Sequence, residues 1–333
     1  MSVGHRLPFH RIRTVAWAAR SEARLRKDGT GWTPSLSGST CRRIGWTWPC
    51  GCLRSSGTRR VVARLKPLAP VAVAVEATGG YETVVAASLA AADLPVVVVN
   101  PAQVRSFAQA LGKRAKSDPI DALVIAHFVE ATRPEIRPLP DAETRLLGDL
   151  VSRRRQIVGM ITAERQRQKI LTGKRLQRSI ARLLAALQKE LSSLETDIDQ
   201  AVRGSPAWRE KEDLLASVPG IGKIIARTVM AELPEIGTLD RRQIAALVGL
   251  APWTRQSGTW KGKSFIGGGR AAVRAALFLG AMVAARHNPE LKLFRDRLVQ
   301  AGKPKLVALV ATARKLLTIL NAVIRDRKPW QPA

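Results

Sequence analysis

The sequence predicts an α/β domain followed by a long helical hairpin and an all-α domain. Three observations support this prediction. Apolar strand-like runs alternate with helical segments within residues 61–132, a polar helical segment covers residues 141–203, and Gly and Pro turns separate short helices within residues 210–330. With 333 residues, of which 46% are hydrophobic, the chain is long enough for two domains with their own cores.

The α/β domain is predicted from a strand, helix, strand, helix order. An apolar run at residues 71–75 is typical of a buried strand and ends at Glu76, before a Gly-rich turn. Residues 82–92 favour a helix, residues 94–100 favour a second buried strand, and Pro101 suits the first position of the next helix. Strands that alternate with helices in this way predict a parallel sheet covered by helices.

Residues 1–60 are predicted to be poorly structured. Gly, Ser and Pro interrupt this segment throughout, and neither strand alternation nor a helical stripe persists in it. Its only acidic residues are Glu22 and Asp28. The first regular domain is therefore expected to begin near residue 61.

The helical parts follow a linker. Prolines 134, 138 and 140 mark residues 132–140 as this linker. Residues 141–203 carry leucines at helical spacing, and Thr172-Gly173 interrupts them, which predicts a helical hairpin or coiled coil. Residues 210–330 are predicted to form the all-α C-terminal domain.

The charge of the chain points to a polyanionic partner. Its 55 Lys and Arg outnumber 26 Asp and Glu, which gives a formal net charge of +29. Repulsion among so many positive charges destabilises the folded chain unless a polyanion neutralises them, and the phosphates of nucleic acid can do so. An anionic membrane is the competing partner, but the most apolar stretch, residues 275–285, is too short to span a bilayer. The sequence therefore favours nucleic acid and no membrane.

The cysteines indicate the compartment. The chain has three of them, and an odd number at this spacing is not a disulfide framework. We therefore expect a cytoplasmic, nucleoid-associated protein.

Three carboxylates follow a pattern with two interpretations. Glu76 ends a strand, where open α/β sheets bind ligands, and Asp118 and Asp121 begin a helix. Asp118 as N-cap with Asp121 as the capping-box acid explains the pair structurally. The same i, i+3 spacing places both carboxylates on one helix face, where with Glu76 they could hold Mg²⁺. Spacing alone leaves both interpretations open.

A family resemblance bears on this choice. The motifs Val75-Glu76-Ala-Thr-Gly-Gly, Val99-Asn100-Pro101 and Lys116-Ser-Asp118-Pro-Ile-Asp121 resemble the N-terminal domain of the DEDD transposases of insertion sequences. That family is similar to the RuvC resolvase, with an RNase H-like fold in which four acids bind a divalent metal. The resemblance implies that Glu76, Asp118 and Asp121 are the second to fourth acids and bind Mg²⁺ or Mn²⁺.

The first acid of that pattern is missing, so the RNase H-like domain is expected to be incomplete. Nothing in residues 1–60 matches a strand with an early aspartate. Trp has the single codon TGG, and every Thr codon begins with AC. In the frame that starts on the third base of each codon, Trp46-Thr47 therefore contains GAC, an Asp codon. Trp48-Pro49 likewise encodes GCC, an Ala codon. We therefore hypothesise that residues up to about 55 are a frameshifted translation; the alternative is a divergent N-terminus or chance.

The start of the C-terminal domain resembles half of a helix-hairpin-helix element. In Ser217-Val-Pro-Gly220-Ile-Gly222-Lys223, the glycines could let backbone amides approach a phosphate, and Lys223 adds charge. A plain Gly turn between packed helices explains the motif equally well.

A basic, glycine-rich loop precedes the apolar helix near residue 275 and suits a DNA backbone. Its predicted phosphate-binding residues are Arg255, Lys261, Lys263, Arg270 and Arg274. Ser257 in this loop has no histidine nearby, so by itself it is more typical of a turn than of a nucleophile. The loop is similar to the C-terminal domain of the same transposases. Members of that family are serine-dependent recombinases, some of them guided by a bridge RNA. The resemblance therefore implies that Ser257 is the nucleophile.

These features predict a DNA transposase or recombinase of an insertion sequence. Two alternatives stay open: a RuvC-like junction nuclease that uses the acids alone, and a catalytically dead DNA-binding remnant. The expected partners are DNA, a guide RNA and a second copy of the chain, because recombination requires two DNA partners held together.

Overall fold

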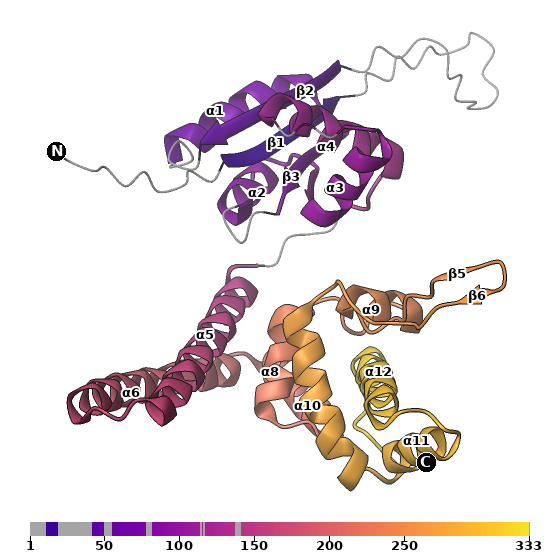
Figure 1. The fold of residues 1–333 in the computed structure, drawn as a ribbon. Coiled ribbons are helices and arrows are strands. Elements are labelled where there is room, and N and C mark those ends of the chain that lie inside the picture. The colour runs from indigo at the N-terminus through magenta and orange to yellow at the C-terminus, as the bar shows by residue number, and fades with distance from the viewer. Residues whose placement is uncertain are drawn as a thin grey trace. The chain divides into compact units, whose positions relative to one another are not determined.

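The chain forms two compact units, Met1–Leu139 (unit 1) and Pro140–Ala333 (unit 2), which are described separately (Figure 1). The structure, a computed structural model, describes residues 11–18, 42–49, 55–77, 82–113, 115, 117–136 and 141–332. For residues 11–18, 42–49, 55–57, 118 and 119 it describes only the backbone.

Unit 1 contains a four-stranded sheet with the strand order β2-β1-β3-β4. The strands are β1 (Arg11–Ala18), β2 (Arg42–Pro49), β3 (Ala72–Glu76) and β4 (Val96–Val99). β3 and β4 run parallel, whereas β1 runs antiparallel to both β2 and β3. The sheet is therefore mixed, and the prediction of an all-parallel sheet holds only for β3 and β4.

Helices cover both faces of this sheet. They are α1 (Ser55–Leu65), the short 3-10 helix η2 (Lys66–Leu68), α2 (Glu82–Ala90), α3 (Pro101–Ala110) and α4 (Asp118–Thr132). Side chains of β3 alternate between two apolar clusters. Val73 and Val75 pack with α1 and α2, and Ala72 and Ala74 pack with α3 and α4. This alternation is the reason for the uninterrupted apolar run in the sequence, since both faces of β3 are buried.

The prediction that residues 1–60 are poorly structured is wrong for the described parts of that segment. Strands β1 and β2 and the start of α1 lie within it. The missed signal is short-range alternation: Ile44, Trp46 and Trp48 alternate with Arg43, Gly45 and Thr47 in the sequence. The Arg content and the interrupting Gly masked this period-two pattern.

Unit 2 begins with a helical hairpin. Its two arms are α5 (Ala142–Ile170) and α6 (Lys174–Gly204), and the predicted break at Thr172-Gly173 lies between them. Buried Ile157 and Ile161 of α5 pack against Ile180 and Leu184 of α6. Because only residues 171–173 join the arms, the helices run antiparallel.

The remainder of unit 2 is a helical domain with a small hairpin. Its elements are α7 (Pro206–Ala216), α8 (Lys223–Glu232), α9 (Arg241–Val248), β5 (Gln256–Ser257), β6 (Trp260–Lys261), α10 (Ala271–His287), α11 (Pro289–Gln300) and α12 (Lys305–Asp326). One apolar cluster joins α7 to α10 and α12 and includes the fully buried Leu215, Leu277 and Leu317.

The apolar stretch of residues 275–285 lies within α10. Among the described residues, α12 alone has the length and apolar composition of a membrane span, with a mean hydropathy of 1.7 over its 18-residue window. Half of that window is buried inside the protein. Leu316, Leu317 and Leu320 of α12 belong to the core of unit 2, so its apolar character is explained by packing.

Candidate catalytic residues and nucleic-acid interface

Glu76 is a buried carboxylate at the carboxyl end of β3. Its exposed fraction is 8%. Because side chains alternate along a strand, Glu76 lies on the same face as Ala72 and Ala74, the face that packs against α4. A carboxylate at this depth is stable only with a cation or hydrogen-bond donors around it.

Asp118 and Asp121 lie in the first turn of α4, which packs against β3 on this same face of the sheet. The capping interpretation needs correction, because Ser117 is the N-cap and Asp118 is the first helical residue. The Asp121 amide bonds to the Ser117 carbonyl at 2.9 Å, as in a regular helical turn. Asp121 is 9% exposed, so this face of the sheet contains a second buried carboxylate.

A complete metal-binding set is not formed by the described side chains. No group of three or more His, Cys, Asp or Glu side chains within the described part of the chain is placed to hold a metal ion. The Asp118 side chain lies outside the described residues. What the structure gives is two buried carboxylates, Glu76 and Asp121, on one side of the sheet; the three-acid metal site stays a prediction.

The strands that precede β3 supply no further acid. β1 is the neighbour of β3, with Thr14 opposite Val75, and neither β1 nor β2 contains Asp or Glu. Glu22 and Asp28 lie outside the described residues. The frameshift hypothesis therefore stays a prediction, and the nucleotide sequence of the gene tests it. A stop codon in the shifted frame, or a shifted frame without an Asp-containing strand, would exclude it.

The turn between α7 and α8 combines a packing role with an exposed helix start. Gly220 has φ +103°, and a Cβ there would lie 2.6 Å from the backbone nitrogen of Ala284 in α10. Close approach of this turn to α10 therefore requires glycine, as the interpretation of a packed turn predicts. Gly222 is the N-cap of α8 and has open space around it, and Lys223 is exposed beside it. Gly222 and Lys223 stay candidates for phosphate contact.

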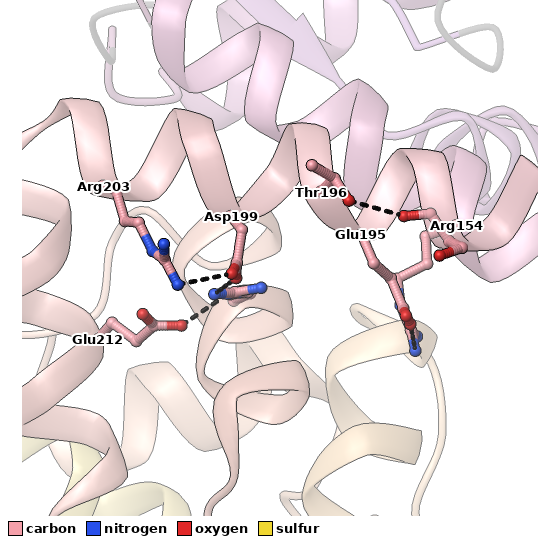
Figure 2. Close-up of polar contacts among 8 residues, drawn as sticks. Arg154, Glu195, Thr196, Asp199, Arg203 and Glu212 are labelled. Carbon is pink, nitrogen blue, oxygen red and sulfur yellow. Dashed lines mark hydrogen bonds and ion pairs between the residues drawn. The ribbon is translucent and has the colours of Figure 1, made fainter.

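A groove of about 650 Å³ within unit 2 is lined by α5, α6, α8 and α10. Most of its cations are neutralised by acids of the same unit. Arg154 pairs with Glu195 at 2.6 Å, and Arg203 pairs with Asp199 at 3.1 Å (Figure 2). Lys223 also lines the groove and forms no ion pair with a described residue.

Arg227 of α8 is the centre of the most buried ion-pair network in this groove. Its side chain is 12% exposed and contacts both Asp199 and Glu212, whose carboxylates lie near each other in Figure 2. Hydrogen bonding from Arg227 holds the pKa of Asp199 below its ordinary value of 3.8, and the charges of Arg227 and Arg203 add to this effect. The network joins α8 to α6 and α7.

Replacing Arg227 with methionine is expected to destabilise unit 2 by about 3 kcal/mol, because the buried Glu212 carboxylate would lose its partner. The matched control is Arg203→Met, which removes a 72% exposed partner of the same Asp199 and is expected to cost less than about 1 kcal/mol. Urea unfolding measures both. Equal losses of stability in the two variants would contradict the central role of Arg227 in this network.

The same ion pairs predict a pH dependence. Since the pKa of Asp199 is lowered in the folded state, the stabilisation that ionised Asp199 contributes is present above about pH 4 and is lost on further acidification.

Two of the predicted phosphate-binding arginines are held inside unit 2. Arg270 forms a two-pronged ion pair with Glu235 and also donates to the Glu232 carbonyl. Arg274 donates to the carbonyls of Val248 and Gly268. Their guanidinium groups therefore fix the glycine-rich loop against α8 and α9, which leaves fewer of their donors for a phosphate; phosphate binding by Arg270 and Arg274 stays a prediction.

The other predicted residues of this loop lie on an exposed hairpin formed by β5 and β6. Ser257 is directly opposite Trp260, and the two-residue turn Gly258-Thr259 joins the strands. Ser257, Arg255, Lys261 and Lys263 are all exposed. The three cations form no ion pair with any described residue, and the Ser257 hydroxyl bonds to none. The hairpin therefore presents a hydroxyl among three available positive charges.

Sequence reasoning missed the aromatic residues of this hairpin. Trp253 and Phe265 bridge the base of the hairpin through backbone hydrogen bonds, and their rings stack at 6.2 Å. The Arg255 guanidinium lies 5.2 Å from the centre of the Phe265 ring. The signal was present in the sequence as aromatic residues interleaved with Arg and Lys, a pattern typical of nucleic-acid binding.

A sheet with two buried carboxylates and a basic hairpin without ion-pair partners among the described residues are features typical of nucleic-acid-processing proteins. Comparison with known proteins identifies the family. A transposase profile of the DEDD type found in IS110 matches residues 54–174, and the profile of the transposase IS116/IS110/IS902 family matches residues 212–296.

Individual relatives agree with these profiles. The chain is 31% identical over 261 residues to a pilin gene-inverting protein of Moraxella bovis, which covers 77% of this chain and 80% of the relative. It is also 31% identical over 166 residues to a 42 kDa protein of insertion element IS900 from Mycobacterium paratuberculosis, covering 47% of this chain and 41% of that relative. The chain belongs to the IS110/IS116/IS902 family of insertion-sequence transposases. It is therefore a DNA transposase or recombinase by family.

Proposed function

We propose that this protein cuts and rejoins DNA strands with Ser257 as the nucleophile, assisted by a divalent metal held in unit 1. The observation that carries the proposal is the exposed Ser257 hydroxyl on a hairpin whose Arg255, Lys261 and Lys263 have no ion-pair partners among the described residues. A phosphodiester beside this serine would have its flanking charges neutralised by these three side chains.

Glu76, Asp118 and Asp121 would hold the metal. Carboxylate oxygens are hard ligands that suit Mg²⁺ or Mn²⁺, and the burial of Glu76 and Asp121 fits a site that balances negative charge with a cation. When bound, the metal would offset charge on the scissile phosphate and favour the serine alkoxide. A missing first acid would leave this site with one ligand fewer than the family's four.

The covalent step exchanges one phosphoester bond for another. The Ser257 Oγ attacks the phosphorus and loses its proton, the bond from phosphorus to one deoxyribose oxygen breaks, and that oxygen leaves as a hydroxyl after it gains a proton. Attack by a hydroxyl of another strand then releases Ser257. No phosphodiester bond energy is lost in this exchange, so rejoining requires no external energy source such as a nucleoside triphosphate.

Three features support the proposed partners. The Moraxella relatives are named for gene inversion, a DNA rearrangement, and we extend this type of reaction to the present chain. A guide RNA would add further phosphates for the net charge of +29. The helical hairpin exposes apolar residues that a second copy of the chain could cover: Leu146, Val158, Met160, Ile170, Leu176 and Leu183.

The test is covalent capture of DNA. The purified chain, and a second form whose first 55 residues are read in the shifted frame, are incubated with a supercoiled plasmid carrying this insertion sequence and its flanking DNA. We expect the restored form to give a protein–DNA adduct that survives denaturation and requires Mg²⁺, with much less adduct from the chain as sequenced.

The same assay separates the alternatives. Junction cleavage without an adduct would support a nuclease that uses the acids alone. Salt-sensitive DNA binding without Mg²⁺-dependent chemistry in either form would support a binding remnant. Either result would overturn the proposal.

Replacing both Lys261 and Lys263 with alanine is expected to weaken DNA binding and to lower the slope of log K against log salt concentration by about 2, because each phosphate contact contributes about 0.9. Fluorescence anisotropy at several salt concentrations measures this slope. The matched control replaces Lys189 and Lys211, exposed lysines of α6 and α7, and should leave the slope unchanged. Equal changes in both double variants would contradict a specific role of the hairpin.

A further inference from the structure

The hairpin of unit 2 exposes a large aromatic surface that the proposed chemistry does not use. Trp260 is 58% exposed, as is Trp253, and neither ring belongs to the apolar core of unit 2. Residues 253–265 contain Arg255, Lys261 and Lys263 and no acid. Exposed indoles beside unpaired cations are the combination that binds nucleic-acid bases and their phosphates.

The strand register places Trp260 beside the serine. Ser257 and Trp260 are directly paired across the hairpin. Opposite residues in an antiparallel pair project from the same face, with their Cβ atoms about 5 Å apart. One face of the hairpin therefore combines a hydroxyl and an indole. Arg255 directly precedes β5, and its guanidinium lies over the Phe265 ring.

Gly262 fixes the orientation of the indole. A Cβ at Gly262 would lie 2.4 Å and 2.9 Å from two ring carbons of Trp260, so the ring rests directly against the Gly262 backbone. The Gly262 amide bonds to the Arg255 carbonyl at 3.0 Å, which holds this backbone in the hairpin. One side of the ring is thus supported by the protein, and its large exposed fraction leaves the other side open to solvent.

We propose that Trp260 stacks on an unpaired base of the DNA strand that Ser257 attacks, which positions the phosphate next to that base at the Ser257 hydroxyl. The substrate at the point of cleavage is then single-stranded or locally unstacked DNA, since a base inside a duplex has no free face for the indole. This inference deepens the proposed function and rests on it for the role of Ser257, but the stacking site itself does not depend on that role.

The experiment measures the affinity of the full chain for a fluorescent single-stranded DNA 20-mer and for the corresponding duplex. We expect Trp260→Ala to weaken single-strand binding roughly 5- to 100-fold, the range for loss of one stacked base, and duplex binding less than about twofold. Trp260→Phe should recover most of the single-strand affinity. The control Leu293→Ala, which truncates an exposed apolar side chain of α11, should change neither.

A second variant tests the orientation of the ring. Gly262→Ala keeps the indole but displaces it, so we expect single-strand affinity to fall, and the Trp260→Ala, Gly262→Ala double variant to bind no more weakly than Trp260→Ala alone. Melting curves of the full-length variants test whether they fold.

Three results would overturn the inference. They are unchanged single-strand binding in Trp260→Ala, equal losses for single strand and duplex, and a loss confined to a single-stranded RNA of the same sequence. Its failure is distinguishable from failure of the proposed function, because Ser257→Ala should retain full single-strand affinity. Covalent adduct formation by Ser257→Ala would remove the serine mechanism while leaving the stacking result intact.

Discussion

Replacing Ser257 with alanine is expected to abolish the covalent protein–DNA product and strand transfer, with a loss of at least about 10³-fold in a form that is active. Removal of a nucleophile leaves only the contributions of binding and electrostatics, and in other enzymes such losses reach about 10⁶-fold. DNA affinity should stay within about twofold, because the cations Arg255, Lys261 and Lys263 are retained. The yield of adduct after denaturation measures covalent product formation, and fluorescence anisotropy measures DNA affinity.

The chain offers a close control for this substitution. Ser264 is a second exposed serine of the same loop, and Ser264→Ala should leave the adduct yield unchanged. Ser257→Cys keeps a nucleophilic atom and should give a reduced but detectable adduct. Strand transfer by Ser257→Ala at the rate of the unchanged protein would remove Ser257 from the mechanism.

Replacing Glu76 with glutamine is expected to abolish stabilisation of unit 1 by Mg²⁺ or Mn²⁺. A ligand at 100 times its dissociation constant stabilises the folded state by about 2.7 kcal/mol, which corresponds to an increase in Tm of roughly 6–10 °C for a unit of this size. The amide oxygen of glutamine is neutral and a weaker ligand, so the increase should disappear. Differential scanning calorimetry with and without the metal measures it, and requires no catalytic activity.

The control for Glu76→Gln is Glu130→Gln, a change of the same type near the opposite end of α4. It should leave the metal-dependent increase in Tm intact. Asp121→Asn is expected to behave like Glu76→Gln, because Asp121 is the other buried carboxylate on this face of the sheet. A normal increase in Tm in both the Glu76 and Asp121 variants would exclude the proposed metal site.

Local patterns in the sequence were sufficient to predict many elements. Apolar runs located β3 and β4, Pro101 located the start of α3, and Thr172-Gly173 located the break between α5 and α6. Each of these signals depends on a few neighbouring residues. The start of α4 was misassigned by one position, because a Ser-Asp-Pro sequence offers two adjacent N-cap candidates and only the backbone torsions distinguish them.

Strands β1 and β2 illustrate the limit of such patterns. Their pairing joins residues about 30 positions apart, Val15 with Gly45 for example, and β1 then pairs with β3 about 60 positions further along the chain. Pairing over such separations is stabilised by the complete sheet, and local composition carries little of that information. For the same reason, composition alone could not identify β1 as the neighbour of β3.

The sequence by itself determined the charge of the chain, the identity of most helices, and the placement of one acid at a strand end and two at a helix start. These properties depend on composition and on spacing within one or two turns. The tertiary structure decided which basic side chains are available for DNA. Arg270 and Arg274 have the same charge as Lys261, yet their guanidinium groups bind carbonyl and carboxylate groups of unit 2. The carboxylate that binds Arg270 belongs to Glu235, which is 35 positions away in the sequence. It also decided that Trp260 shares a face with Ser257, since cross-strand register exists only in the folded hairpin.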